Sequence, residues 1–291
     1  MSKKVALVLS GGGARGMAHV GVIEELEERG YEITSIAGTS MGALVGGVYA
    51  QGKLQEFKNW MISLDRGKVF RLIDFTLSAQ GIIKGDKVLN AMKEFIPDIN
   101  IEDLKISYSA TAVDIVKHKE VVFRKGSLYD AIRASIAIPT VITPVRKDGA
   151  VLVDGGVMNN IPITNIERTE GDILIAVYVN ADIPVRKPAA LEKDEKKNQS
   201  VYLKKIAEFY EHLNLNHQKE KKEKLGYFSL IDKTITTGML KLAQLAIEKG
   251  KPDILINVSH DACGTYDFYK ANELIEIGRY AAVTTLDKIK Q

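Results

Sequence analysis

The chain has 291 residues, 45% of them hydrophobic and 26% charged, which is typical of a globular protein large enough for one α/β domain. Its 40 basic and 37 acidic residues give a formal net charge of +3, which argues against a nucleic-acid partner and allows at most a mild preference for anionic surfaces. A single cysteine, Cys263, excludes an intrachain disulfide and favours a reducing, intracellular setting. No apolar run approaches the roughly 18 residues of a membrane span, and the stretch before Gly11 is too short for a secretory signal, so the sequence predicts a cytoplasmic location.

Strand and helix patterns alternate along the chain. The apolar run at 5–9 lacks polar alternation, as expected of a parallel strand covered on both faces. A helix at 17–29, ended by Gly30, and a strand at 33–37 complete one β-α-β unit. Further patterns predict helices at 41–51, 54–64, 86–95, 127–137 and 268–290, and strands at 106–114, 120–124, 150–153, 173–179 and 254–258. This alternation predicts an α/β fold with three α/β/α layers around a mostly parallel central sheet, in a single domain over 1–291.

The composition changes between residues 184 and 225. Prolines are followed by a run of charges at 192–197, and a second charge run occupies 219–224 between helical stretches at 201–217 and 225–249. We interpret 184–225 as a charged, mobile insertion or lid. The helix at 225–249 has an apolar stripe that could line an acyl channel or face a membrane, although such a stripe more often packs in a core: Met239, Leu240, Leu242, Leu245 and Ile247.

The pattern Gly38-Thr39-Ser40-Met41-Gly42 joins the strand at 33–37 to a helix. It matches G-x-S-x-G, the nucleophile elbow, in which a sharp strand-to-helix turn presents a serine. Ser40 must then lie in a strained turn, where a Cβ at position 38 or 42 would collide with neighbouring backbone. The first amides of the helix would also face any negative charge that forms near the serine oxygen. The pattern therefore predicts Ser40 as a nucleophile.

A glycine-rich stretch, Gly11-Gly12-Gly13-Ala14-Arg15-Gly16, follows a strand and opens a helix. It satisfies the dinucleotide pattern G-x-G-x-x-G, but a ribose site would need an acidic residue after the second strand, where the chain has Gly38-Thr39-Ser40. We favour an oxyanion hole in which the amides of Gly12 and Gly13, with Ala14 or Arg15, stabilise charge on a substrate carbonyl oxygen. Arg15 would add positive charge or brace the loop. A purely structural turn is the remaining interpretation.

A nucleophilic serine needs a base, and two residues at strand ends are candidates. Asp154 follows the strand at 150–153, and Gly155 and Gly156 would let the chain turn away and a substrate approach. His260 follows the strand at 254–258, and Ser40, Asp154 and His260 would reproduce the chain order of an α/β-hydrolase triad. The other histidines are interpreted as structural or solvated: His19, His118, His212 and His217.

Three motifs follow one another in a specific order: Gly-Gly-Gly-x-Arg-Gly at 11–16, G-x-S-x-G at 38–42 and Asp-Gly-Gly at 154–156. This order resembles the patatin-like phospholipases. The block Ser135-Ile136-Ala137-Ile138-Pro139 is similar to the small-residue-plus-proline block that precedes Asp-Gly-Gly in that family. The family's glycine motif often begins with Asp where this chain has Ser10, a difference of little consequence if the backbone amides bind the anion.

The resemblance implies a Ser40–Asp154 dyad, in which Ser40 attacks an ester carbonyl and Asp154 accepts its proton, without a metal or other cofactor. It also implies a lipid or acyl-ester substrate and allows peripheral contact with a membrane surface. An ordinary carboxylate is a far weaker base than imidazole. Burial would raise the pKa of Asp154 and make it a better base. Two alternatives stay open: an esterase with a Ser40–Asp154–His260 triad, and a non-catalytic nucleotide-binding or regulatory protein that uses the loop at 11–16. The oligomeric state is not predicted by any pattern.

Overall fold

The computed structural model describes residues 3–78, 81–188 and 227–289. Its central sheet has eight strands: β1 (Lys3–Leu9), β2 (Tyr31–Thr39), β5 (Ser107–Asp114), β6 (Lys119–Phe123), β8 (Val145–Lys147), β9 (Ala150–Asp154), β10 (Ile173–Ala181) and β11 (Ile254–Ser259). The strand order is β11-β10-β1-β2-β5-β9-β8, and β6 also pairs with β5. The βα unit formed by β1 and the following helix therefore lies near the middle of the sheet.

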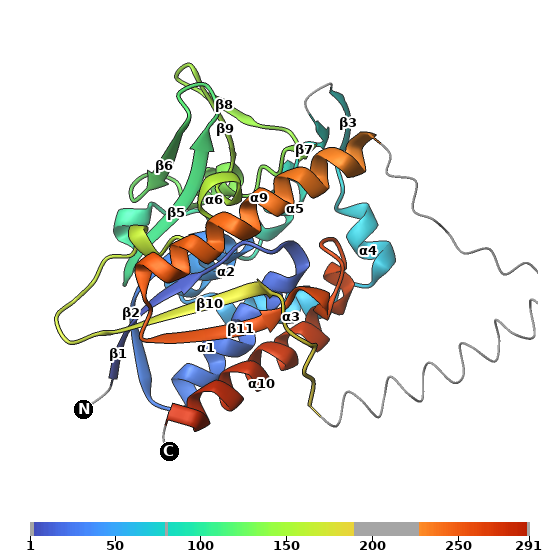
Figure 1. Cartoon of the computed structure of the whole chain (residues 1–291). Helices are drawn as coiled ribbons and strands as arrows, with labels where there is room; N and C mark the ends of the chain where they lie inside the picture. The colour runs from blue at the N-terminus through green and yellow to red at the C-terminus, as the bar shows by residue number, and fades with distance from the viewer. Residues whose placement is uncertain (1–2, 79–80, 189–226, 290–291) are drawn as a thin grey trace, which may run out of the picture.

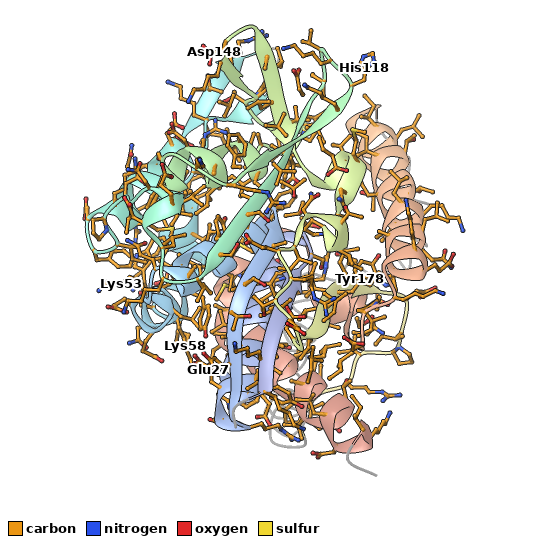
Figure 2. The ribbon with its side chains drawn as sticks, turned by 90° about the vertical axis from the view of Figure 1, so that its left-hand side faces the viewer. Glu27, Lys53, Lys58, His118, Asp148 and Tyr178 are labelled. Carbon is orange, nitrogen blue, oxygen red and sulfur yellow. The ribbon has the colours of Figure 1, made fainter. Side chains whose placement is uncertain are left out.

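The two halves of this sheet differ in strand direction. Strands β11, β10, β1, β2 and β5 run parallel. The pairs β5–β6, β5–β9 and β8–β9 are antiparallel. Turns too short for a crossover join β5 to β6 and β8 to β9, and His118 and Asp148 mark these turns at the top of Figure 2. The predicted α/β/α fold is confirmed, with a sheet that is mixed because these hairpins form its second half.

Helices cover both faces of the parallel half (Figure 1). Successive side chains of β1 point to opposite faces, so Val5, Leu7 and Leu9 join one apolar core, and Ala6 and Val8 join another. The first core includes side chains of α1 (Ala18–Glu28), α2 (Met41–Ala50), α3 (Leu54–Ile62), α6 (Leu128–Ser135) and α10 (Ala271–Ile289). The second lies under α9 (Tyr227–Gly250), which packs on α7 (Gly156–Asn159) and on the 3-10 turn η3 (Ile163–Asn165).

Helices α1 and α10 cross with their backbones in close contact. A Cβ at Gly21 would lie 1.9 Å from Ile275 O, and a Cβ at Gly278 would lie 2.0 Å from Ala18 O. Each helix thus uses one glycine to admit the backbone of the other. This crossing joins a segment near the start of the chain to one near its end.

A smaller sheet has the order β3-β4-β7, formed by β3 (Phe75–Ser78), β4 (Gly81–Ile83) and β7 (Thr140–Ile142). It neighbours α4 (Arg66–Arg71) and α5 (Asp86–Lys93). The Asp74 carboxylate accepts hydrogen bonds from the amides of Gly85, Asp86 and Lys87, and so fixes the start of α5. The sequence predicts α5 but neither α4 nor these strands, because strands of three or four residues contain too few positions for a periodic signal.

Helix α9 corresponds to the helix predicted at 225–249, and its apolar stripe is divided. Ile247 packs against the second core, whereas Leu240, Leu242 and Leu245 are exposed. The proposed insertion at 184–225, apart from its first five positions, and the helix predicted at 201–217 lie outside the described residues. Within the described ranges, no helix combines the length and the apolar character needed to cross a membrane.

Candidate active site

Ser40 stands at the junction of β2 and α2, where the backbone turns sharply. Its φ of 54° and ψ of −124° lie in a region that residues other than glycine rarely adopt. A Cβ at Gly38 would lie 2.5 Å from Ala43 N, and a Cβ at Gly42 would lie 2.2 Å from Leu9 O. Both positions therefore require glycine, and the turn has the geometry that the nucleophile-elbow interpretation predicts.

Ser135 supports this turn from the last residue of α6. Its hydroxyl accepts a hydrogen bond from Ser40 N at 2.8 Å and donates one to Thr111 O at 2.7 Å. The Ser135 side chain is completely buried. It thus ties the strained backbone of Ser40 to strand β5, and its removal would leave a buried amide without an acceptor.

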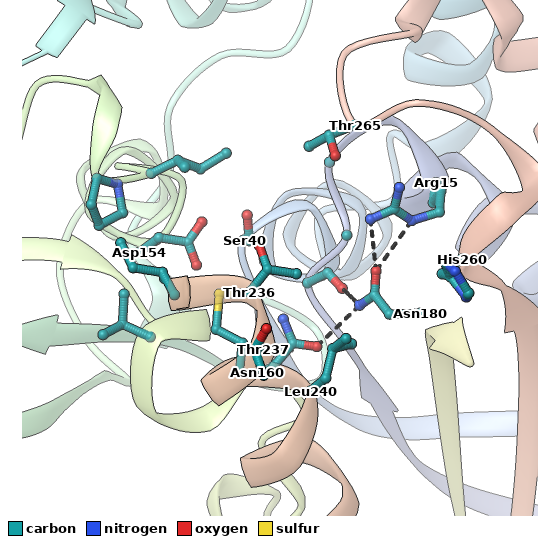
Figure 3. Close-up of a pocket in the computed structure, with 18 of the residues that line it drawn as sticks. Arg15, Ser40, Asp154, Asn160, Asn180, Thr236, Thr237, Leu240, His260 and Thr265 are labelled. Atoms are coloured by element: carbon teal, nitrogen blue, oxygen red, sulfur yellow. Dashed lines mark hydrogen bonds between the residues drawn. The ribbon is translucent and has the colours of Figure 1, made fainter. Parts of the chain in front are cut away.

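Asp154 ends β9, and its buried carboxyl lies beside Ser40 (Figure 3). Burial raises the pKa of Asp154 to about 6, although hydrogen bonds from the Ser40 side chain and the Gly156 amide oppose this by favouring the charged form. The Gly156 N to Asp154 Oδ1 distance is 2.7 Å. A Cβ at Gly155 would lie 2.3 Å from Thr111 O, so glycine is required where the chain turns away from β5. A carboxylate with a pKa near 6 is a stronger base than an ordinary aspartate.

The glycine-rich loop lies between β1 and α1 and lines the same cavity as Ser40. Gly13 has a φ of 56°, a left-handed conformation that favours glycine. The amide of Ala14 donates to Thr265 O at 2.8 Å, so in this conformation Ala14 is not available as an oxyanion donor. The amides of Gly12 and Gly13 donate to no residue that the structure describes. These two amides therefore remain the candidate donors for a substrate oxygen.

Arg15 is bound by neutral acceptors. Its Nε and Nη2 donate to Asn180 Oδ1 at 3.1 and 2.9 Å, and its Nη1 donates to Cys263 O at 3.1 Å. Asn180 Nδ2 in turn donates to Gly11 O at 2.7 Å and to Asn160 Oδ1 at 3.3 Å, so Asn180 connects the guanidinium to the glycine-rich loop (Figure 3). Burial lowers the pKa of Arg15. Arg15 therefore braces the loop and places a positive charge beside it.

His260 lies beyond Asn180 from Ser40 in Figure 3. Its Nε2 is 3.2 Å from Asp261 Oδ1, and its Nδ1 is 3.3 Å from Ala181 O. Its side chain is 43% exposed. His260 lines the cavity, but its hydrogen-bonding partners do not include Asp154.

His19 is buried in α1, as expected of a structural histidine. Its Nε2 is 2.8 Å from Ser10 O, and burial lowers its pKa to about 4. The ring is therefore neutral at physiological pH, and it forms a hydrogen bond with Ser10, the residue before the glycine-rich loop.

A cavity of about 450 Å³ lies over these groups. Helix α9 lines it through Ile235, Met239 and Leu240, and Asp154 and Asn160 also line it. In the described part of the chain, no cluster of three or more His, Cys, Asp and Glu side chains is arranged to hold a metal ion.

Sequence patterns do not identify the supporting residues Asn160 and Asn180, and they include Ser135 only as part of a family block. Asn180 lies 165 positions from Arg15, and Ser135 lies 95 positions from Ser40. No local pattern surrounds Asn180, and the family block around Ser135 does not indicate a contact with Ser40. The signal that could have found them is their place at the ends of α6 and β10, next to the carboxyl edge of the parallel strands, where α/β proteins bind ligands.

A strained turn serine, a buried carboxyl at a strand end and a glycine-rich loop form a combination that fits hydrolases with a serine nucleophile. The family model of the patatin-like phospholipases matches residues 7–165. The chain therefore belongs to the patatin-like phospholipase family. Membership of this family supports a role in the hydrolysis of lipids.

Two relatives illustrate the range of this similarity. An NTE family protein of Mycobacterium bovis is 35% identical over 98% of this chain and 92% of its own length. The lysophospholipase NTE1 of Kluyveromyces lactis is 30% identical over 94% of this chain, a region that makes up 18% of that larger protein. Among solved structures, VipD of Legionella pneumophila has a TM-score of 0.50 and 15% identity, and it covers 99% of this chain and 67% of its own. The similarity to VipD concerns the fold alone.

Proposed function

We propose that the chain is a serine acyl hydrolase that cleaves fatty-acyl esters of lysophospholipids through Ser40 and Asp154. The substrate class is suggested by the lysophospholipases among its relatives. The observation that supports the dyad most directly is the buried Asp154 carboxyl, with a pKa of about 6, beside a serine in a strained elbow.

In the proposed first step, Ser40 Oγ attacks the ester carbonyl carbon and its proton passes to Asp154. The negative charge that develops on the carbonyl oxygen is stabilised by the amides of Gly12 and Gly13 and by the nearby charge of Arg15. Collapse of this intermediate breaks the bond to the alcohol oxygen, which takes the proton from Asp154. Water then attacks the acyl carbon on Ser40 while Asp154 accepts its proton. Collapse of this second intermediate breaks the bond to Ser40 Oγ, which takes the proton back from Asp154, and the free fatty acid leaves.

The two-residue mechanism is favoured over a Ser40–Asp154–His260 triad by the surroundings of His260. The imidazole contacts Asp261 and Ala181 rather than Asp154. A triad would require the carboxyl to orient the imidazole that acts on the serine. The nucleotide-binding alternative has no such support, because the residue that follows β2 is the elbow serine rather than a ribose-binding acid.

Labelling with a fluorophosphonate probe tests the proposal, because this reagent reacts only with an activated serine. We expect the wild type to be labelled, Ser40→Ala to be unlabelled, and Asp154→Asn to be labelled at least about 100-fold more slowly, within the range typical for loss of a general base. Hydrolysis of 1-palmitoyl-lysophosphatidylcholine should follow the same order. An unlabelled wild type with intact circular dichroism, or equal labelling of the Ser40→Ala variant, would exclude the proposed mechanism.

A further inference from the structure

A second cavity, of about 410 Å³, also reaches Ser40. Five residues line both this cavity and the cavity under α9: Gly13, Ser40, Ile138, Thr265 and Tyr266. The second cavity extends between the helices α2 and α3 of the first core and the small sheet. Its walls come from α2, α3, α4, α5, β7 and the segments next to them, through residues such as Leu44, Trp60, Leu72, Val88 and Ile142. Two cavities therefore meet at the candidate nucleophile.

The second cavity is lined almost entirely by apolar side chains. Among the described residues that line it, the one carboxylate is Asp74, which already accepts three hydrogen bonds from backbone amides at the start of α5. A charged or strongly polar group would lose its hydration on entering and would find few partners. An alkyl chain would gain free energy for each methylene removed from water.

The cavity under α9 has a different character. It contains Arg15, Asn160, Asn180, His260 and two threonines of α9, alongside apolar residues. These side chains can hydrogen-bond to hydroxyl and phosphate oxygens. The chemistry of the two cavities thus matches the two parts of a lipid ester, one on either side of its carbonyl carbon.

We propose that the second cavity binds the acyl chain of the substrate, so that the ester carbonyl lies at Ser40 and the alcohol part occupies the cavity under α9. This assignment rests on the proposed function. A cavity of about 150 Å³ holds the six carbons of benzene, or roughly 25 Å³ per carbon, so the second cavity has room for a chain of about 16 carbons. The site is built for one long chain, and the apolar stripe of α9 is not the acyl channel.

Chain-length dependence of turnover tests this assignment. The substrates are p-nitrophenyl esters from acetate to palmitate, and the variant is Val88→Phe, which places a larger side chain in the cavity wall. Each methylene transferred from water should raise kcat/KM about fourfold. The extra volume of phenylalanine should displace two or three methylenes, so the ratio of kcat/KM for palmitate to that for acetate should fall about 15- to 60-fold. Val116→Phe, at an exposed turn position, is the matched control and should leave this ratio unchanged.

A binding measurement separates this proposal from the proposed function. The affinity of Ser40→Ala for palmitate can be measured by calorimetry even if the chain hydrolyses nothing, and Val88→Phe in that background should weaken it by a similar factor. An equal loss for all ester lengths, or unchanged palmitate affinity, would overturn the acyl-chain assignment. If Met239→Trp on α9 instead shortened the preferred chain while Val88→Phe did not, the orientation of the substrate would be reversed.

Discussion

Replacing Asp154 with Asn should stabilise the fold while it removes the proposed base. Burial raises the pKa of Asp154 from an ordinary value of 3.8 to about 6. Between these two pH values the folded protein binds more protons at this site than the unfolded chain does. The free energy of unfolding therefore falls as the pH rises through this window, because a buried carboxylate must then be charged. Asparagine keeps an oxygen for the Gly156 amide and carries no charge.

The size of this effect follows from the pKa difference. A pKa of about 6 in place of 3.8 corresponds to about 3 kcal/mol at pH 8, where the carboxylate is charged in both states. We expect Asp154→Asn to exceed the wild type in unfolding free energy by up to about this amount at pH 8, and by much less at pH 4. The dependence on pH is the specific prediction, since a packing change would contribute equally at both values.

Urea unfolding followed by tryptophan fluorescence and circular dichroism at pH 4, 5, 6, 7 and 8 measures this difference. Asp172→Asn is a control with the opposite sign. Burial tends to raise the pKa of Asp172, but hydrogen bonds from the Thr169 amide and from Arg168 outweigh it and hold this pKa below its ordinary value. Asp172→Asn should therefore lose stability at neutral pH and lose less as the carboxylate is protonated in acid.

The pH dependence of kcat/KM in the wild type provides a second measurement of the pKa of Asp154. If Asp154 accepts the proton from Ser40, kcat/KM should fall below an apparent pKa of about 6. A stability difference that is constant from pH 4 to pH 8 would refute the argument from burial. Full activity at pH 4.5 would refute the assignment of this carboxyl as the base.

Three further changes test the support of the site. Ser135→Ala removes the acceptor of the Ser40 amide and should lower kcat/KM for a short ester about 10- to 100-fold. The free energy of unfolding in urea should fall by roughly 1–3 kcal/mol. Unchanged kinetics would show that the strained turn at Ser40 does not need this hydrogen bond. Gly42→Ala places a Cβ 2.2 Å from Leu9 O and should cost at least about 2 kcal/mol in the same assay, a cost that wild-type stability would disprove. His260→Gln should change kcat/KM less than about threefold, whereas a loss of the 100-fold order expected for a general base would favour the triad.

Much of the fold can be predicted from the sequence because its parallel strands are buried on both faces. Continuous apolar runs such as 5–9 and 173–179 are visible without an alignment, and Gly38 and Gly42 are explained by steric rules that apply to any elbow. The antiparallel half of the sheet cannot be predicted in the same way. A strand such as β8, with three residues, shows no periodicity, and the direction of pairing depends on turn lengths rather than on strand composition.

The candidate catalytic residues can be predicted from the sequence, but the contacts that hold them and the glycine-rich loop in place cannot. Ser40 and Asp154 occur in patterns whose spacing has a steric meaning. Whether an amide of the glycine-rich loop is available depends on a contact that no local pattern encodes: Ala14 bonds to Thr265, 251 positions further on. The apolar cavity is likewise assembled from many segments that each look like ordinary core.

The contacts between the glycine-rich loop and the last part of the chain have a consequence for synthesis on the ribosome. Ser40 emerges early, but the carbonyls of Cys263 and Thr265 and the crossing of α1 with α10 become available only after residues 263–289 have been translated. A domain generally folds as a unit, so contacts between its first and last elements form only when both have been synthesised. A growing chain therefore exposes a serine whose surrounding loop is still unbraced. Chains released before residue 263 therefore lack the contacts that brace this loop.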